Sequence, residues 1–264
     1  MSTVPEIGRE VRDFYARYPQ LATSEVTWIT RFSFEGHRVL DAGCGDGAIL
    51  EAIARRGGLS LGVGLDLSPA SLETAARRTD DALRFVAGSI FQVPVADRSV
   101  DDVLSIGVVH YFPDAQPILQ EYARVLRPGG RMFLFVYRPH PVHTLRLWML
   151  GRSGTRALAR LGPGGTEVER NLVMNTVDPP RYWPLSRRRI GRLAEACGLE
   201  VVSIEPKPTH VPQLLLRGAA GPRPAAWRTW SARAVEAVTR HDPLHLLAFG
   251  YYVVARRRPT DVTP

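Results

Sequence analysis

The sequence predicts an α/β fold, in which a mostly parallel β-sheet carries helices on both of its faces. Short apolar runs bounded by glycine, proline or aspartate alternate with longer segments whose apolar residues recur at helical spacing. The chain has 264 residues, of which 45% are hydrophobic and 23% are charged. This length suits one soluble globular core and is too short for two cores of this class. We therefore expect a single core that carries insertions.

The first half of the sequence predicts five strands and three helices in alternation. The expected strands lie at 38–40, 61–65, 83–86, 103–106 and 131–136, and the expected helices lie at 48–56, 69–78 and 118–126. Ser68 followed by Pro69 indicates a helix start, because serine caps free amides and proline fits the first turn. The run Pro128-Gly129-Gly130 ends the third helix and turns the chain into a strand.

Beyond Tyr137 the alternation is interrupted twice, and the interruptions divide the chain into parts. We expect an N-terminal helical cap at 1–37, the core at 38–137, a lid insertion at 138–184 and the remainder of the core at 185–264. The remainder holds a helix at 186–197 ended by Gly198, strands at 199–204 and 249–255, and a second insertion at 206–247. Both insertions are expected to lie over the sheet.

The chain is strongly basic, with a formal net charge of +8, and nearly all of its cations are arginines because Lys207 is the only lysine. A basic balance suits nucleic acid, a membrane surface or an acidic substrate as partner. The arginines are dispersed, however, and the two runs at 187–189 and 256–258 are not interleaved with stacking aromatics. We therefore interpret the charge as a compositional bias and expect no nucleic-acid partner.

The sequence gives no signal for export or for a membrane span. The N-terminal residues carry charges throughout, and no run of eighteen uncharged apolar residues occurs. Cys44 and Cys197 are expected to stay free, since Cys44 lies in a glycine loop. The segment 142–161 mixes apolar residues with arginines as a membrane-surface helix does, but Gly151 and Gly154 interrupt it and favour a lid. We expect a cytoplasmic protein without a membrane partner.

The strongest motif is a glycine loop between the first strand and the first helix of the core, where residues 39–48 read VLDAGCGDGA. Glycine lets backbone N–H groups approach a ligand closely, and the start of a helix favours anionic groups. A polar ligand is therefore expected here. Gly43, Gly45 and Ala48 also satisfy the dinucleotide fingerprint, so the loop alone leaves a dehydrogenase with a nicotinamide cofactor open.

Three features together carry a resemblance. Asp41 precedes the glycine loop, Asp66 ends the second strand, and residues 124–130 read RVLRPGG before the fifth strand. With this set of motifs, residues 38–136 resemble the class I S-adenosylmethionine-dependent methyltransferases. The resemblance implies a Rossmann-like, doubly wound, seven-stranded, mostly parallel sheet with helices on both faces, an antiparallel last strand and insertions that cap the cofactor mouth. It also implies S-adenosylmethionine as the cofactor.

The resemblance places the parts of the cofactor on residues of this chain. The glycine loop faces the methionine portion, Asp41 orients the amino group, and Asp66 accepts hydrogen bonds from both ribose hydroxyls. In the family the third strand ends in Gly-Asp, whose acid addresses the adenine amino group, but here residue 89 is serine. The Ser89 hydroxyl and the Ile90 backbone are expected to replace it, with altered affinity. The full expected set is Asp41, Gly43, Cys44, Gly45, Asp66, Leu67, Ser89, Ile90 and Ile106.

Methyl transfer is a displacement at a sulfonium methyl, so the protein mainly positions the acceptor and excludes water. In open α/β sheets, ligands bind at the carboxyl ends of the strands. His110 and Tyr111 follow the fourth strand and Tyr137 follows the fifth, which makes these three the candidate catalytic residues. His110 has the residue type of a base near neutrality. Its alternative role is structural, in which it orients the loop or touches the cofactor.

Four further residues are candidates for the acceptor pocket, because they lie in the predicted lid or in the N-terminal cap. They are Tyr15, Tyr18, His140 and His143. Packing of the N-terminal helix is an equally good reason for the two tyrosines. The lid histidines and the pair His241 and His245 form a possible metal set, but no cysteine or acidic cluster accompanies them, so no metal is expected.

The sequence therefore predicts an S-adenosylmethionine-dependent methyltransferase that acts on a small, partly apolar acceptor through O-, N- or C-methylation, for example of a secondary metabolite. The insertions favour a closed pocket over a flat basic groove. Three alternatives stay open besides the dehydrogenase: a nucleic-acid or protein methyltransferase, an enzyme that uses the cofactor for a cyclisation or another displacement, and a non-catalytic binding module. The acceptor, the methylated atom and the oligomeric state are not determined by these patterns.

Overall fold

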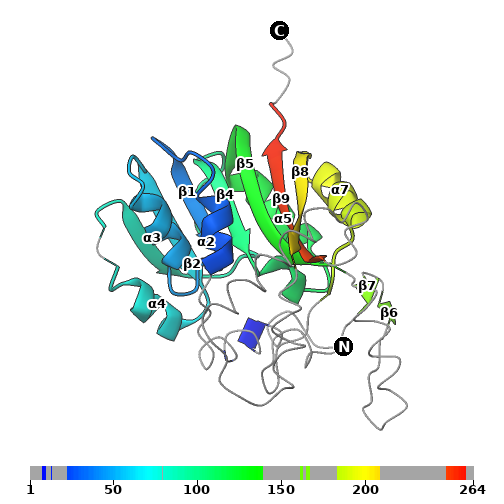
Figure 1. Cartoon of the computed structure of the whole chain (residues 1–264), viewed down its shortest axis with the longest axis horizontal. Coiled ribbons are helices and arrows are strands. Elements are labelled where there is room, and N and C mark those ends of the chain that lie inside the picture. The colour runs from blue at the N-terminus through cyan, green and yellow to red at the C-terminus, as the bar shows by residue number, and fades with distance from the viewer. Residues whose placement is uncertain are drawn as a thin grey trace, which may run out of the picture.

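The fold is centred on one seven-stranded β-sheet (Figure 1). The computed structural model describes residues 8, 9, 13, 23–78, 80–138, 161–162, 165–166, 183–208 and 248–259. The strands are β1 (Arg38–Ala42), β2 (Leu61–Asp66), β3 (Leu83–Ala87), β4 (Val100–Ile106), β5 (Leu126–Tyr137), β8 (Leu199–Pro208) and β9 (Ala248–Arg257), in the order β3-β2-β1-β4-β5-β9-β8. All pairs are parallel except those of β9, which runs against β5 and β8. The predicted Rossmann-like sheet with an antiparallel last strand is confirmed.

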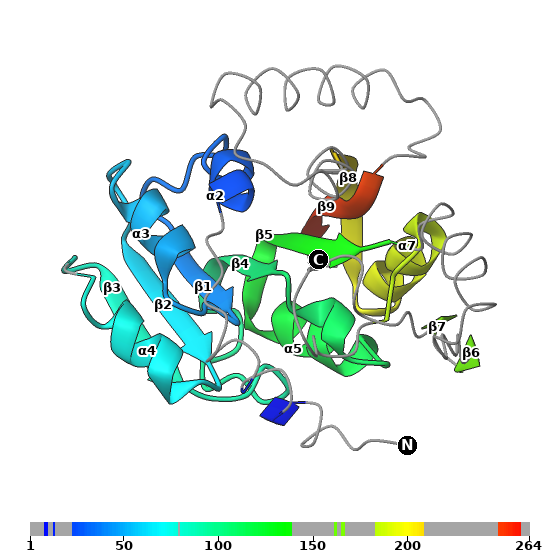
Figure 2. The ribbon, with the colours of Figure 1, turned by 60° about the horizontal axis from the view of Figure 1, so that its bottom comes forward.

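Helices cover both faces of this sheet, with α2 and α3 on one face and α5 and α7 on the other (Figure 2). The helices are α2 (Thr23–Ile29), α3 (Ala48–Ala54), α4 (Pro69–Ala75), α5 (Gln116–Val125), α7 (Arg187–Ala196) and the 3-10 turn η1 (Val109–Tyr111). Two short strands, β6 (Leu161–Gly162) and β7 (Gly165–Thr166), pair with each other. In the described part of the chain, no helix is long and apolar enough to cross a membrane.

Alternation along β5 produces two separate apolar cores. Met132 and Leu134 pack with α5 and α7 on one face, whereas Phe133 and Phe135 pack with α2 and α3 on the other. Successive side chains of a strand point to opposite faces, so a central strand that is apolar at every position must be covered on both sides. All four of these side chains are buried, which explains why the apolar run at 132–136 is continuous and not alternating.

The predicted helix starts and stops are confirmed at two places. The hydroxyl of Ser68 accepts a hydrogen bond from the Ser71 amide at the start of α4, with a distance of 3.3 Å. Gly198 follows α7 with φ +71°, a left-handed conformation that glycine adopts without a Cβ penalty.

Several predicted boundaries are wrong. The run Pro128-Gly129-Gly130, expected to end a helix before a strand at 131, lies inside β5, which begins at Leu126. Leu126, expected as the last residue of a helix, already pairs with Val100 in the sheet, so β4 begins three residues before the expected position. The strand expected at 199–204 continues to Pro208, into the segment predicted as an insertion. Proline is tolerated there because β8 is an edge strand, whose outer amides need no partner. Most of the predicted lid and most of the second insertion lie outside the described residues.

Replacing Gly250 by alanine is expected to destabilise the protein by about 1–3 kcal/mol, the usual range for overpacking. A Cβ at this position would lie 2.4 Å from Phe135 Cε2 and 2.8 Å from the carbonyl oxygen of Val136. The matched control is Gly191→Ala in α7, where a Cβ would meet nothing within 4 Å. Alanine is the better helix former by about 0.5–1 kcal/mol, so the control is expected to stabilise. Urea unfolding measures both changes, and equal effects would contradict this packing argument.

Candidate functional site

The candidate site lies where the carboxyl ends of β1, β2 and β4 meet. The amides of Gly43 and Cys44 donate hydrogen bonds to the Leu65 carbonyl at 2.7 and 3.0 Å. These bonds fold the glycine loop over the end of the neighbouring strand β2. The loop and the end of β2 therefore form one unit, as the sequence predicted for a ligand-binding edge.

Asp66 is held in this unit through both of its carboxylate oxygens. Its Oδ2 accepts a hydrogen bond from the Gly45 amide at 2.9 Å, and its Oδ1 accepts one from the Ser68 amide at 2.8 Å. Burial raises the pKa of Asp66, while these amides and that of Leu67 act in the opposite direction. A carboxylate oxygen has more than one lone pair. Asp66 is thus oriented by the backbone and keeps acceptor capacity for ligand hydroxyls.

Two glycines of the loop serve different purposes. Gly43 has φ +87°, and a Cβ there would lie 2.4 Å from Val108 Cγ2, so the loop packs directly on the segment after β4. Gly45 has φ +55°, and a Cβ there would meet nothing within 4 Å. The first glycine is required by close packing inside the protein, and the second borders open space at the predicted ligand side.

Asp41 supplies a buried acidic group beside the loop. It is 1% exposed, and its Oδ2 has no hydrogen-bond partner among the described residues. Burial raises the pKa of Asp41 to about 8, and the nearby carboxylates of Asp66 and Asp46 act in the same direction. A buried carboxyl oxygen without a partner fits a cationic ligand group such as the ammonium of an amino acid. The carboxyl groups of Asp41 and Asp66, together with the glycine loop, therefore suit the methionine and ribose parts of S-adenosylmethionine.

The remaining expected cofactor residues lie around the same edge. Cys44 is buried, and burial raises the pKa of its thiol further above the ordinary value. Leu67 is 43% exposed, which is high for a large apolar residue. The Ser89 hydroxyl accepts a hydrogen bond from the Phe91 amide at 3.2 Å, and the Ile90 side chain is buried in the core. Only the backbone of Ile90 remains for a ligand. Ile106, the last residue of β4, is half-buried.

The structure brings the three catalytic candidates together. The His110 ring lies 4.6 Å from that of Tyr111 and 4.1 Å from that of Tyr137, measured between centroids. His110 is fully buried, and burial lowers its pKa to about 3. These observations favour the structural role of His110 over the role of a catalytic base. Both roles stay predictions.

Several predicted site residues lie outside the described part of the chain: Tyr15, Tyr18, His140, His143, His241 and His245. Within the described ranges, no group of three or more histidine, cysteine, aspartate or glutamate side chains gathers as a metal site would require.

Lys207 is a residue of this edge that sequence reasoning missed. It lies at the carboxyl end of β8, is 5% exposed, and pairs with the Glu25 carboxylate of α2. Its ammonium lies 4.2 Å from the ring centroid of Phe135 and 5.6 Å from that of Tyr252. Burial lowers the pKa of Lys207 to about 7. The available signal was a single lysine, placed between two prolines at the end of an apolar strand.

Comparison with known proteins agrees with this geometry. Residues 40–134 match a family model described as a methyltransferase domain. This segment is a class I S-adenosylmethionine-dependent methyltransferase domain. Its cofactor is S-adenosylmethionine, which separates the methyltransferase domain from the dehydrogenases that its glycine loop also resembles.

The chain is similar to known proteins in sequence and in fold. The fatty-acid O-methyltransferase of Mycolicibacterium smegmatis is 39% identical over 106 residues, which cover 40% of this chain and 39% of the relative. The chain therefore matches about two fifths of that relative's length. The cyclase SpnF has a TM-score of 0.59 at 18% identity, covering 90% of this chain and 82% of its own. Geranyl diphosphate C-methyltransferase from Streptomyces coelicolor A3(2) has a TM-score of 0.58 at 18% identity, covering 90% and 79%. The two structures show a shared fold.

Asp41→Asn is expected to change the pH dependence of stability in the absence of cofactor. The raised pKa of Asp41 means that the folded state binds this proton more tightly than the unfolded state. The resulting stabilisation is complete below the ordinary pKa of an aspartate and is lost as the pH rises to about 8. The variant lacks this loss. Relative to the native protein, its free energy of unfolding is therefore expected to increase as the pH rises from 4 to 8.

Urea unfolding at pH 5, 7 and 8.5 measures this difference, and calorimetry provides the second readout. The same substitution removes the expected anionic partner of the methionine ammonium. Charged hydrogen bonds contribute about 1.5–3 kcal/mol, so the affinity for S-adenosylmethionine is expected to fall roughly 10- to 100-fold. Glu73→Gln, which alters an exposed carboxylate of α4, is the control and should change neither quantity. Parallel stability curves for Asp41→Asn and the native protein would contradict the assignment.

Proposed function

We propose that the protein transfers the methyl group of S-adenosylmethionine to an ionised oxygen of a small, partly apolar acceptor, with carboxylates as the first acceptor class. When bound, S-adenosylmethionine supplies an electrophilic methyl group on a sulfonium. Asp41, the glycine loop and Asp66 would hold it, because their groups suit an ammonium, a closely approaching polar chain and a pair of ribose hydroxyls.

The proposed acceptor class is inferred from the burial of His110. Its ring is fully buried, and the neighbouring rings of Phe135 and Tyr137 lie 6.2 and 4.1 Å away. With a pKa of about 3 this histidine is a weak base at pH 7. It is therefore poorly suited to remove a proton from a neutral hydroxyl. An acceptor oxygen that is already ionised needs no such base. In this proposal, the packed rings of His110 and Tyr137 form one side of the acceptor pocket and position the acceptor.

The similarity to a fatty-acid O-methyltransferase supports the same acceptor class, since fatty acids combine a carboxylate with an apolar chain. We further propose that the predicted lid at 138–184 and the residues Tyr15, Tyr18, His140 and His143 close the acceptor pocket. The proposal keeps the remaining expectations from the sequence: a cytoplasmic enzyme that acts without a nucleic-acid partner or a membrane.

Cofactor binding is the first test. Calorimetric titration is expected to show binding of S-adenosylmethionine and of S-adenosylhomocysteine, and no binding of NAD. Asp66→Ala is expected to weaken both about 100-fold or more, because two hydrogen bonds to a charged acceptor are lost. Glu73→Gln serves as the control on the surface of α4. Preference for NAD, or binding that Asp66→Ala leaves unchanged, would refute the proposal.

Acceptor chemistry is the second test. Methyl transfer from radiolabelled cofactor is expected with octanoate and weaker or absent with 1-octanol and octylamine, which share its chain length. With the acceptor that is turned over, His110→Phe is expected to retain kcat within about tenfold and to keep the shape of the pH profile, whereas loss of a general base usually costs about 10²–10⁴ in rate. A preference for 1-octanol, abolished by His110→Phe, would restore His110 as the base.

A further inference from the structure

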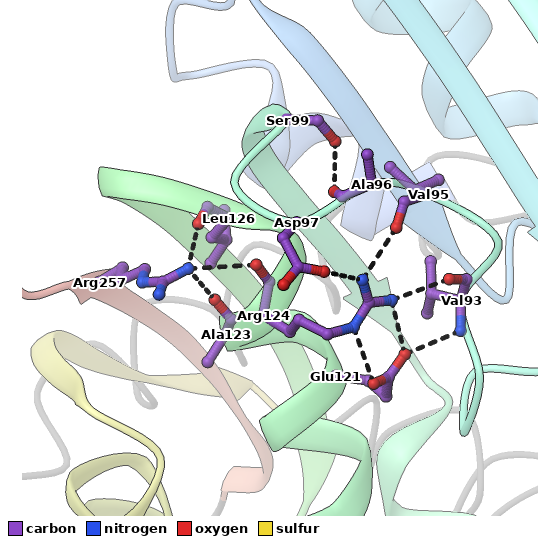
Figure 3. A network of polar contacts seen from close by, with 10 residues as sticks. All are labelled: Val93, Val95, Ala96, Asp97, Ser99, Glu121, Ala123, Arg124, Leu126 and Arg257. Carbon is purple, nitrogen blue, oxygen red and sulfur yellow. Dashed lines mark hydrogen bonds and ion pairs between the residues drawn. The ribbon is translucent and has the colours of Figure 1, made fainter.

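Arg124 lies at the centre of a polar network that joins the last turn of α5 to the loop between β3 and β4 (Figure 3). Its Nε donates to Glu121 Oε1 at 2.9 Å, and its Nη2 donates to Glu121 Oε2 and to the Val93 carbonyl, each at 2.9 Å. Its Nη1 donates to the Val95 carbonyl at 3.0 Å and to Asp97 Oδ1 at 2.6 Å. A guanidinium has five N–H donors in a fixed plane, so these five bonds saturate it.

Backbone groups complete the attachment of the loop 93–99 to the end of α5. Glu121 Oε2 also accepts a hydrogen bond from the Val93 amide at 2.9 Å, so this carboxylate holds both the guanidinium and the loop. The amides of Arg98 and Ser99 donate to the carbonyls of Arg124 and Val125, each at 2.9 Å. Arg98 adopts φ +54°, which turns the loop back towards the helix. The loop is therefore fixed by the shape of a planar group, not by charge alone.

The clamped loop continues directly into the predicted adenine end of the cofactor site. The Gly88 amide donates to the Asp66 carbonyl at 3.0 Å, so the chain leaves β3 beside the ribose-binding carboxylate. Ser89 and Gln92 pair in a short antiparallel bridge, and the next residue, Val93, is the first that Arg124 grips. The backbone held by Arg124 is therefore joined through Gln92 and this bridge to Ser89.

In this chain the backbone is expected to carry the adenine contacts. Residue 89 is a serine, so no carboxylate is available at this position to accept from the adenine amino group. The Ile90 side chain is buried in the core, so only its backbone groups are expected to contact the adenine. A backbone group discriminates between donors and acceptors only when its position is fixed.

We propose that Arg124 is a positioning residue for adenine recognition. Through Glu121 and the carbonyls of Val93 and Val95, it fixes the backbone at 89–90 that stands in for the missing acid. Arg124 thereby determines the selectivity of the site for the 6-amino group of the purine. The inference rests on the proposed use of S-adenosylmethionine.

Arg257 provides a matched control in the same network. Its Nη1 donates to the carbonyls of Ala123, Arg124 and Leu126, which lie at the end of α5 and the start of β5. Figure 3 shows it on the other side of the Arg124 backbone from the clamped loop. Loss of Arg257 therefore removes several backbone hydrogen bonds at the same helix end, while the bonds between Arg124 and the loop remain.

The test compares S-adenosylhomocysteine with its inosine analogue, which carries an oxygen in place of the 6-amino group. Calorimetry is expected to show that the native protein prefers S-adenosylhomocysteine about tenfold or more. Arg124→Met is expected to reduce this preference to within about twofold, mainly through weaker binding of S-adenosylhomocysteine. Arg257→Met is expected to keep the native preference even where it lowers the thermal stability.

Two milder variants keep the test decisive if Arg124→Met fails to fold. Glu121→Gln is expected to reduce the preference partially, and Arg124→Lys is expected not to restore it, because an ammonium has three donors and no fixed plane. A native preference kept in these variants, an equal weakening of both ligands, or no preference in the native protein would overturn the inference. Failure of the native protein to bind S-adenosylhomocysteine at all would instead refute the proposed function.

Discussion

The two hydrogen bonds from the glycine loop to the Leu65 carbonyl determine the layout of the site. They close the turn after β1 onto the end of β2, which places the Gly45 amide on the Asp66 carboxylate and leaves the buried Asp41 behind the loop. Close packing of Gly43 on Val108 then joins this unit to the segment after β4, which carries His110 and Tyr111. The predicted cofactor residues and the candidate catalytic residues thereby belong to one connected frame, which is what methyl transfer by positioning requires.

Two ionisable groups at this edge are buried at a cost in stability. Asp41 keeps an oxygen without a partner among the described residues, and Lys207 is removed from water under α2. Buried pairs such as Lys207 with Glu25 contribute little net stability compared with apolar side chains of similar size. Groups of this kind concentrate at functional sites, and both lie at the carboxyl edge of the sheet. An ion pair between the buried Asp102 and the half-buried Arg131 has a structural role instead, since it joins β4 to β5.

The sequence predicted most of the core because the decisive signals were local. The glycine loop, the capping serine at 68 and the alternation of apolar runs each act within a few residues, and each appears in the structure at the expected position. The errors occurred where a partner far away in the sequence decided the outcome. Leu126 joined the sheet because Val100 was available to pair with it, and β8 passed through two prolines because it is an edge strand among the described residues.

The sequence by itself determined the fold class and the cofactor, since these depend on backbone conformation and on motifs with fixed spacing. Only the tertiary structure decided the burial, the pKa and the contacts of the side chains. It buried His110 among aromatic rings and lowered its pKa, it placed Lys207 over Phe135, and it closed the loop 93–97 around Arg124. The physical reason is that burial and hydrogen-bond partners come from segments distant in sequence, and these set the pKa and the orientation of a side chain.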